Sequence, residues 1–188
     1  MKKIFAIFLL AAAVVMIATA PAAAADRPKH GQDIEVAIEV RADKIYDYVL
    51  IGMHRDATDG LDNAYDTLTP GPGMSDQYIL MVVPHPEWQA LKADFRTDFR
   101  AMKGHDTWKV LITTSLSDGT PLTMSIDQEQ SKIPDGYSVT VEDMATGALQ
   151  DLEQGAYVFP VKASGLAQQF MISIARQAGS HKQRHDRD

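Results

Sequence analysis

The chain has 188 residues, no cysteine, and 25 acidic against 18 basic side chains, which gives a formal net charge of −7. The lack of cysteine excludes disulfides, thiolate metal sites, a cysteine nucleophile and covalent haem attachment. An acidic chain is poorly suited to polyanions, so neither nucleic acid nor an anionic membrane surface is expected as a partner.

Residues 1–25 have the pattern of a secretory signal peptide. Lys2 and Lys3 precede an apolar run over residues 4–20, and alanine-rich residues supply a cleavage site before Asp26. This order of basic, apolar and small residues predicts export to the periplasm, the cell surface or the medium. A retained membrane anchor is the alternative, because the run approaches the length of a spanning helix. No later segment is long and apolar enough to span a bilayer, so no membrane span is expected after cleavage.

The rest of the chain alternates apolar and polar residues in one segment after another, which is the period of a half-buried β-strand. The alternating segments are residues 34–40, 108–113, 122–126, 137–141, 157–161 and 170–174. Residues 45–53 and 77–83 are apolar and are predicted as two further strands. Residues 94–100 are predicted as a strand rather than as part of a helix over 90–99, because threonine and aromatic residues favour strands.

Turn-forming residues separate these segments at short intervals. The clearest turns are Ser117–Gly119, Pro134–Gly136 and Asp143–Gly147. Eight to ten short strands without a convincing amphipathic helix predict an all-β fold, an antiparallel β-sandwich of the immunoglobulin-like or jelly-roll kind. We place this single domain at residues 33–175, after a flexible lead-in at 26–32 and before a disordered polar tail at 176–188.

Four aspartates lie within residues 56–66, just before a turn rich in proline and glycine. They are Asp56, Asp59, Asp62 and Asp66. Calcium, which takes many oxygen ligands, is one explanation, although the spacing around Gly60 does not fit an EF-hand. The other is that Thr58, Asp59 and Asp62 accept hydrogen bonds from the nearby backbone while Gly60 adopts a left-handed turn. We predict this loop-structuring role and keep calcium as the one candidate cofactor.

Residues 57–62, followed by Tyr65 and Asp66 and then by a proline-rich stretch, resemble a loop in a bacterial β-sandwich module. That module occurs in secreted and cell-surface proteins, near type IX sorting domains or beside dockerin-like modules. Further matches lie at residues 94–100, 122–126, 134–147 and 157–159. The chain departs from the pattern at Leu61, where the module usually has an aromatic residue. The resemblance implies a non-catalytic sandwich in an exported protein.

No arrangement of residues indicates catalysis. The sequence has no Gly-x-Ser-x-Gly motif and no common metal-binding histidine spacing, and His54 and His85 are isolated from other catalytic residue types. We therefore predict a non-enzymatic accessory, adhesion or assembly module that contacts a protein partner in an extracytoplasmic assembly.

The alternative function is a calcium-dependent carbohydrate-binding module. In it Trp88, which lies in a predicted loop, would stack against the sugar; its structural alternative is to cover the edge of the sheet. Trp108 is in phase with the alternating apolar residues of its segment and is predicted to lie in the core.

Overall fold

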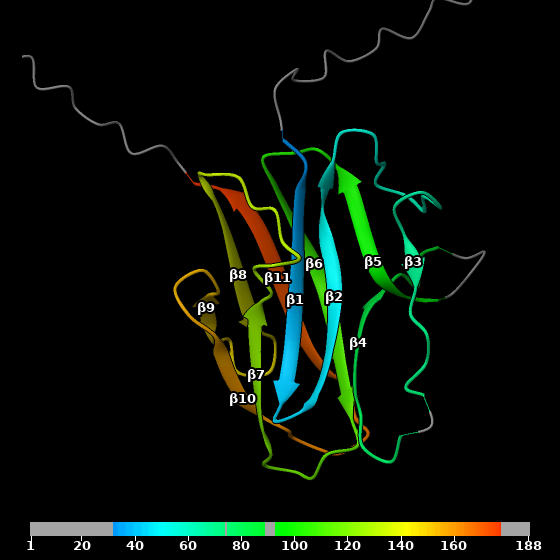
Figure 1. The fold of residues 1–188 in the computed structure, drawn as a ribbon, viewed down its shortest axis with the longest axis vertical. Helices are drawn as coiled ribbons and strands as arrows, with labels where there is room; N and C mark the ends of the chain where they lie inside the picture. Colours follow the sequence, from blue (N-terminus) through cyan, green and yellow to red (C-terminus); the bar gives the residue numbers. More distant parts are fainter. Residues whose placement is uncertain (1–31, 74, 89–92, 178–188) are drawn as a thin grey trace, which may run out of the picture. The chain divides into compact units, whose positions relative to one another are not determined.

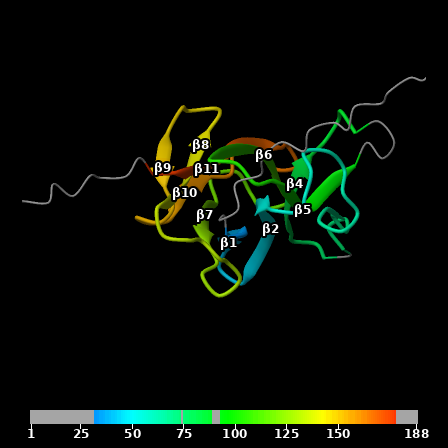
Figure 2. The same ribbon diagram turned by 90° about the horizontal axis from the view of Figure 1, so that it is seen from above.

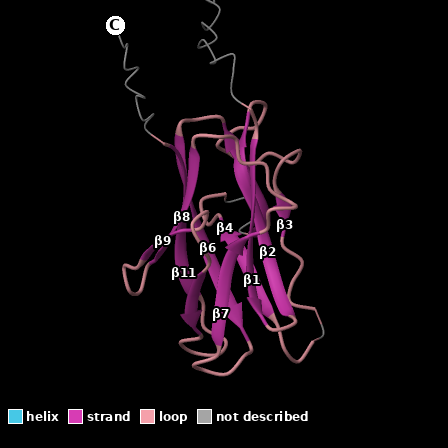
Figure 3. Cartoon of the chain, turned by 60° about the vertical axis from the view of Figure 1, so that its left-hand side comes forward, coloured by secondary structure: helices cyan, strands magenta, loops and turns pink. Residues whose placement is uncertain are grey.

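Eleven β-strands and no helix are found in the computed structural model, which describes residues 32–73, 75–88 and 93–177 (Figures 1 and 3). The strands are β1 (Ile34–Ala42), β2 (Ile45–His54), β3 (Thr67–Leu68), β4 (Ile79–Pro84), β5 (Asp94–Ala101), β6 (His105–Thr114), β7 (Pro121–Ile126), β8 (Tyr137–Asp143), β9 (Leu149–Asp151), β10 (Tyr157–Pro160) and β11 (Gln168–Arg176). The predicted signal peptide lies outside the described residues, as do nearly all of the lead-in and the tail beyond residue 177.

The strands form one continuous sheet path, in the order β10-β7-β1-β2-β5-β4-β6-β11-β8-β9, with β3 paired to β5. Seen from above, β8, β11 and β6 make one row and β7, β1 and β2 make a facing row (Figure 2). The all-β prediction is confirmed. Each of the nine predicted strand segments contains a strand, and the turn at Asp143–Gly147 leads into β9 as a hairpin. The two-residue strand β3 was not predicted.

One pairing departs from the expected antiparallel arrangement. Strands β2 and β5 run parallel, with Leu50 opposite Thr97 and His54 opposite Ala101. Parallel neighbours need a long crossover connection, and here residues 55–93 supply it. This crossover carries the acidic loop, β3 and β4, so the parallel pair determines where the acidic loop lies.

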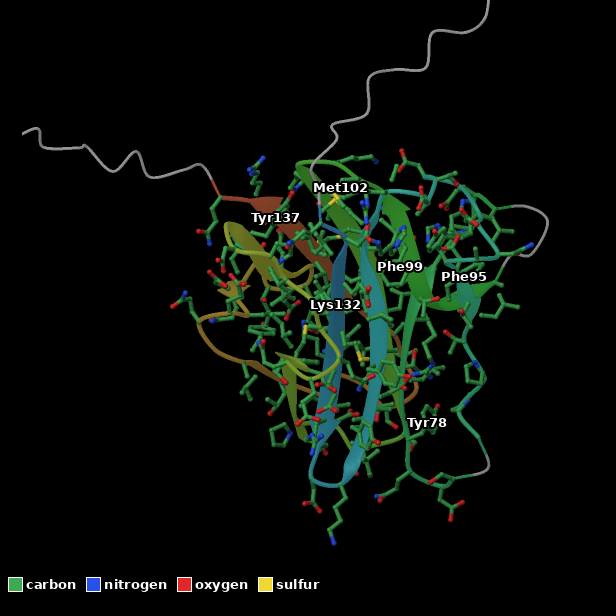
Figure 4. All side chains as sticks on the ribbon, turned by 45° about the horizontal axis from the view of Figure 1, so that its top comes forward. Tyr78, Phe95, Phe99, Met102, Lys132 and Tyr137 are labelled. Carbon is green, nitrogen blue, oxygen red and sulfur yellow. The ribbon has the colours of Figure 1, made fainter. Side chains whose placement is uncertain are left out.

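The two rows share one buried apolar cluster, because alternate residues of most strands face inward. Trp108 is fully buried, as predicted, and is accompanied on β6 by Val110 and Ile112. On β5 the buried positions include both Phe95 and a carboxylate, Asp98. Figure 4 shows Phe95 and Phe99 along this strand. The interior of the fold is therefore polar next to Asp98 on β5.

Among the described residues, two residue pairs join the two rows through β4 and β5, namely Val83 with Phe95 and Pro84 with Asp94. A carboxylate strengthens this junction. Asp47 on β2 accepts a hydrogen bond from the Met81 amide of β4 at 2.8 Å and another from the Arg96 guanidinium at 2.7 Å. The junction therefore depends on side-chain hydrogen bonds as well as on the β-ladder.

Three of the predicted turns contain glycines in the left-handed region, as their sequences require. Gly119 has φ of 81°, Gly136 of 83° and Gly147 of 71°. Gly60 does not adopt this conformation, so the prediction of a left-handed turn in the acidic loop is wrong. The loop is shaped instead by hydrogen bonds that its backbone amides donate to its side chains.

Candidate functional site

The acidic loop, residues 56–66, lies against β5. The buried carboxylate of Asp66 accepts hydrogen bonds from the amide of Asp62 at 2.6 Å and from the amide of Phe99 at 3.2 Å. The hydroxyl of Thr97 donates to the Tyr65 carbonyl at 3.0 Å. The loop thus supplies the acceptor for the Phe99 amide, which is not paired with a neighbouring strand. A backbone amide that is removed from water needs such an acceptor. Burial raises the pKa of Asp66, which outweighs the lowering by its two backbone hydrogen bonds.

The other loop residues have separate partners. Asp62 accepts a hydrogen bond from the Ala64 amide at 3.2 Å, which is an Asx turn, and Thr58 accepts one from the Gly60 amide at 3.3 Å. The Asp59 carboxylate lies 2.9 Å from the ammonium of Lys103. Asp56 is exposed, and its amide faces the His54 ring at 3.2 Å.

The structure therefore brings two of the four aspartates into direct contact, Asp62 through its amide and Asp66 through its carboxylate. Within the described ranges, no group of three or more His, Asp or Glu side chains is arranged to hold a metal ion. The calcium site stays a prediction. A cation there would compete with the hydrogen bonds of Asp66 and with the ion pair of Asp59.

A second polar cluster lies at the β4–β5 junction, around the buried His85. The ring Nε2 lies 2.9 Å from Asp98 Oδ2, and Nδ1 lies 2.6 Å from Glu87 Oε1. Burial alone lowers the pKa of His85, but the hydrogen bonds and charges of Asp98 and Glu87 outweigh it and raise the pKa above its ordinary value. A protonated imidazole donates from both nitrogens and so matches two carboxylates.

Arg100 extends this cluster to β6. Its guanidinium donates to Asp98 at 2.9 Å, to Asp106 at 3.1 Å and to the Thr107 carbonyl at 3.0 Å. The same group lies 4.9 Å above the centre of the Trp108 ring, a cation–π arrangement. The cluster thus connects the end of β4, the inner face of β5 and the start of β6.

The two histidines noted in the sequence have different surroundings. Both nitrogens of His85 already face carboxylates, so a substrate would have to displace one of them to reach the imidazole. His54 belongs to a different place, where its Nε2 lies 3.2 Å from Asp33 and its ring lies 4.6 Å from that of Tyr65. The structure therefore does not bring the two histidines into one site.

Trp88, the predicted sugar contact, covers the junction. Its ring stacks on His85 at 3.6 Å between centroids and meets Phe95 edge to face at 4.9 Å. One face of the indole is therefore occupied, and the ring is packed partly against the core. This is the edge-covering position that the sequence also allowed, while the carbohydrate contact stays a prediction.

Sequence reasoning missed a third feature, which is a set of exposed apolar side chains in the segment that contains β9 and β10. Of the seven large apolar side chains exposed among the described residues, four lie within residues 144–166. These four are Met144 at 45%, Leu149 at 72%, Val158 at 61% and Leu166 at 67% exposed. Leu149 is on β9 and Val158 on β10, strands that lie near each other in both Figure 1 and Figure 2. We call these four residues the apolar patch.

A pocket of about 460 Å³ opens beside the patch. Met144 and Leu166 line it together with Asp143, Lys162 and Gln169. The carboxylate of Asp143 is buried and accepts hydrogen bonds from the Ala145 amide at 2.8 Å and the Tyr157 hydroxyl at 3.1 Å. Burial raises the pKa of Asp143, but these hydrogen bonds and the Lys162 charge outweigh it and lower the pKa below its ordinary value.

Comparison with known proteins gives no relative from which a function could be transferred: no family model, curated protein or solved structure matches the chain. The resemblance to the secreted module therefore stays a prediction. A search of the described residues finds no helix that is long and apolar enough to cross a membrane.

Proposed function

We propose that the chain is an exported, non-catalytic β-sheet module that acts by binding a protein partner in an extracytoplasmic assembly. The observation that carries the proposal is the apolar patch. Single exposed apolar residues are common on protein surfaces, but a concentration of them is typical of interaction sites. Two of its residues, Leu149 and Val158, lie on β9 and β10, the strands at the two ends of the sheet path. Such strands offer unpaired backbone groups to a partner.

The cluster around His85 is consistent with the same proposal. Its carboxylates, imidazole and guanidinium are used to join β4, β5 and β6. His85, Asp98 and Arg100 each have a partner of opposite charge, and removal of one partner would leave an uncompensated buried charge, which is destabilising. The polar groups that would be the first candidates for chemistry thus have a structural role.

We further infer that the fold belongs with the β-sandwiches of immunoglobulin-like or jelly-roll kind. Two facing rows of strands around one core support this classification, although the β2–β5 pair is parallel. Export rests on the N-terminal pattern of residues 1–25. The mass of the protein recovered from the producing cell should correspond to a chain that begins at Asp26.

Site-specific photo-crosslinking in the producing cell tests the protein-binding proposal. A photoreactive amino acid at Leu149 or Val158 should give adducts of discrete size with a protein outside the cytoplasm. Tyr46 is a matched control, because it is 57% exposed but lies on β2, away from the ends of the sheet path. Equal adducts at Tyr46, or none at Leu149 and Val158, would contradict the proposal.

A further inference from the structure

The pocket beside the apolar patch is built from three segments that are fixed by their own hydrogen bonds. The Met144 amide donates to the Gln169 carbonyl at 3.1 Å, and the Leu166 amide donates to the Ala163 carbonyl at 3.1 Å. Gly165, with φ of 78°, is held by a bond from its amide to the Thr114 carbonyl at 2.8 Å. The walls are therefore formed before any ligand arrives, which lowers the entropic cost of binding.

Most of the pocket wall is apolar. Met144 and Leu166 expose large side chains, and the neighbouring Ala145, Ala163 and Ala167 are small enough to leave room between them. At about 460 Å³ the space is within the size range of small-ligand pockets. An apolar side chain that entered it would cover Met144 and Leu166, which water now contacts.

At the polar end of the pocket, the Lys162 ammonium has N–H groups that can donate further hydrogen bonds. The Lys162 ammonium lies 3.6 Å from Asp143, which is an ion pair but is longer than a hydrogen bond. Asp143 already accepts from the Ala145 amide and the Tyr157 hydroxyl. Lys162 is 37% exposed, and no hydrogen bond from its ammonium is found among the described residues. Its N–H groups can therefore meet a second acceptor that arrives from solvent.

We propose that this pocket binds the C-terminal residue of a peptide, with its apolar side chain between Met144 and Leu166 and its terminal carboxylate on Lys162. The apolar wall selects the side chain, and the ammonium selects the carboxylate by charge complementarity. The inference rests on the proposed protein-binding function, because it assigns one part of the partner to one part of the patch.

A titration of the full chain, labelled with ¹⁵N, with acetyl-glycyl-glycyl-leucine tests this assignment. The backbone amides of Ala145, Lys162 and Gln169 should shift saturably, with a Kd in the millimolar range that so small a ligand permits. The C-terminal amide of the same peptide should bind about tenfold more weakly, because the charge-assisted contact is lost. The peptide that ends in alanine should also bind more weakly, since it leaves the apolar wall uncovered.

Lys162→Gln should reproduce the loss seen with the amide peptide, and Lys109→Gln is the matched control, because Lys109 is exposed on β6. Leu166→Ser should weaken binding of the leucine peptide. Equal affinity for the acid and the amide, shifts elsewhere on the surface, or no saturable shift would overturn the assignment. Adducts at Leu149 and Val158 without peptide binding would refute only this inference, whereas the absence of adducts would refute the proposed function itself.

Discussion

Gly52, in the middle of β2, has a packing role that its position in an apolar run does not reveal. A Cβ at this position would collide with the Ile34 carbonyl oxygen of β1 and would lie 3.0 Å from Phe99 of β5. Backbone atoms cannot move aside without disturbing the ladder. Glycine is therefore required here by close approach and not by a left-handed conformation.

We expect Gly52→Ala to destabilise the fold by about 2–4 kcal/mol, as overpacking against backbone does. Gly104→Ala is the control, because nothing lies within 4 Å of its added Cβ. Urea unfolding followed by circular dichroism measures both. Equal losses of unfolding free energy for the two substitutions would contradict the packing role of Gly52.

The aspartates of the acidic loop should differ in their importance. Asp66→Ala leaves the amides of Asp62 and Phe99 without their acceptor, so it should cost about 1–3 kcal/mol. Asp62→Ala removes one Asx bond and should cost about 0.5–1 kcal/mol. Asp59→Ala removes only an exposed ion pair with Lys103 and should have an effect of about 0–1 kcal/mol.

Melting temperatures of these three variants, each in chelator and in calcium, check that order. A calcium-dependent rise in the wild-type melting temperature would show that the folded state binds the ion. If Asp66→Ala abolished the rise, the loop would be a metal site. Three variants with equal stability would contradict the order derived from the hydrogen bonds.

Among the elements, the β4–β5 junction should make stability depend on pH. Because the pKa of His85 is raised on folding above its ordinary 6.5, the charged imidazole is favoured in the folded state. This contribution is fully present below pH 6.5 and is lost as pH rises through the folded-state pKa. The groups that face His85 among the described residues are Glu87 after β4 and Asp98 on β5, with Arg100 bound to Asp98.

His85→Gln should therefore flatten the decrease in unfolding free energy that wild type shows above pH 6.5, and it should lower stability most at mildly acidic pH. His105→Gln, at an exposed residue at the start of β6, is the control. Urea unfolding at a series of pH values gives the profile. A wild-type stability that rises over this range would contradict the assigned direction of the pKa shift.

At the scale of the whole molecule, the described strands share one buried cluster, so they should unfold together. The β4–β5 ladder that joins the two rows has two residue pairs in the described part of the chain, but the core contacts both rows. We expect one transition, with coincident midpoints for tryptophan fluorescence and far-ultraviolet circular dichroism. The fluorescence of Trp88 reports on unfolding of the β4–β5 junction, and that of Trp108 reports on unfolding of β6. Separate transitions for variants that keep only one tryptophan would show that the rows fold independently.

Local patterns were sufficient for the longer strands. Alternation of apolar residues, the left-handed glycines at 119, 136 and 147 and the burial of Trp108 depend on a few neighbouring residues, and the structure agrees with each of them. Asp59 and Asp66, by contrast, have similar neighbours in the sequence but different roles in the structure. Asp66 contacts β5, while Asp59 contacts an exposed lysine.

The amino-acid sequence by itself determined the all-β class and the positions of the longer strands, because alternation and turn residues act within short segments; export stays a prediction from the pattern of residues 1–25. Only the tertiary structure decided which strands are neighbours. The β2–β5 pair joins residues that are far apart along the chain, and the β4–β5 pair brings His85 beside Asp98 and Arg100. The tertiary structure also leaves Leu149 and Val158 exposed on β9 and β10, the two strands at the ends of the sheet path.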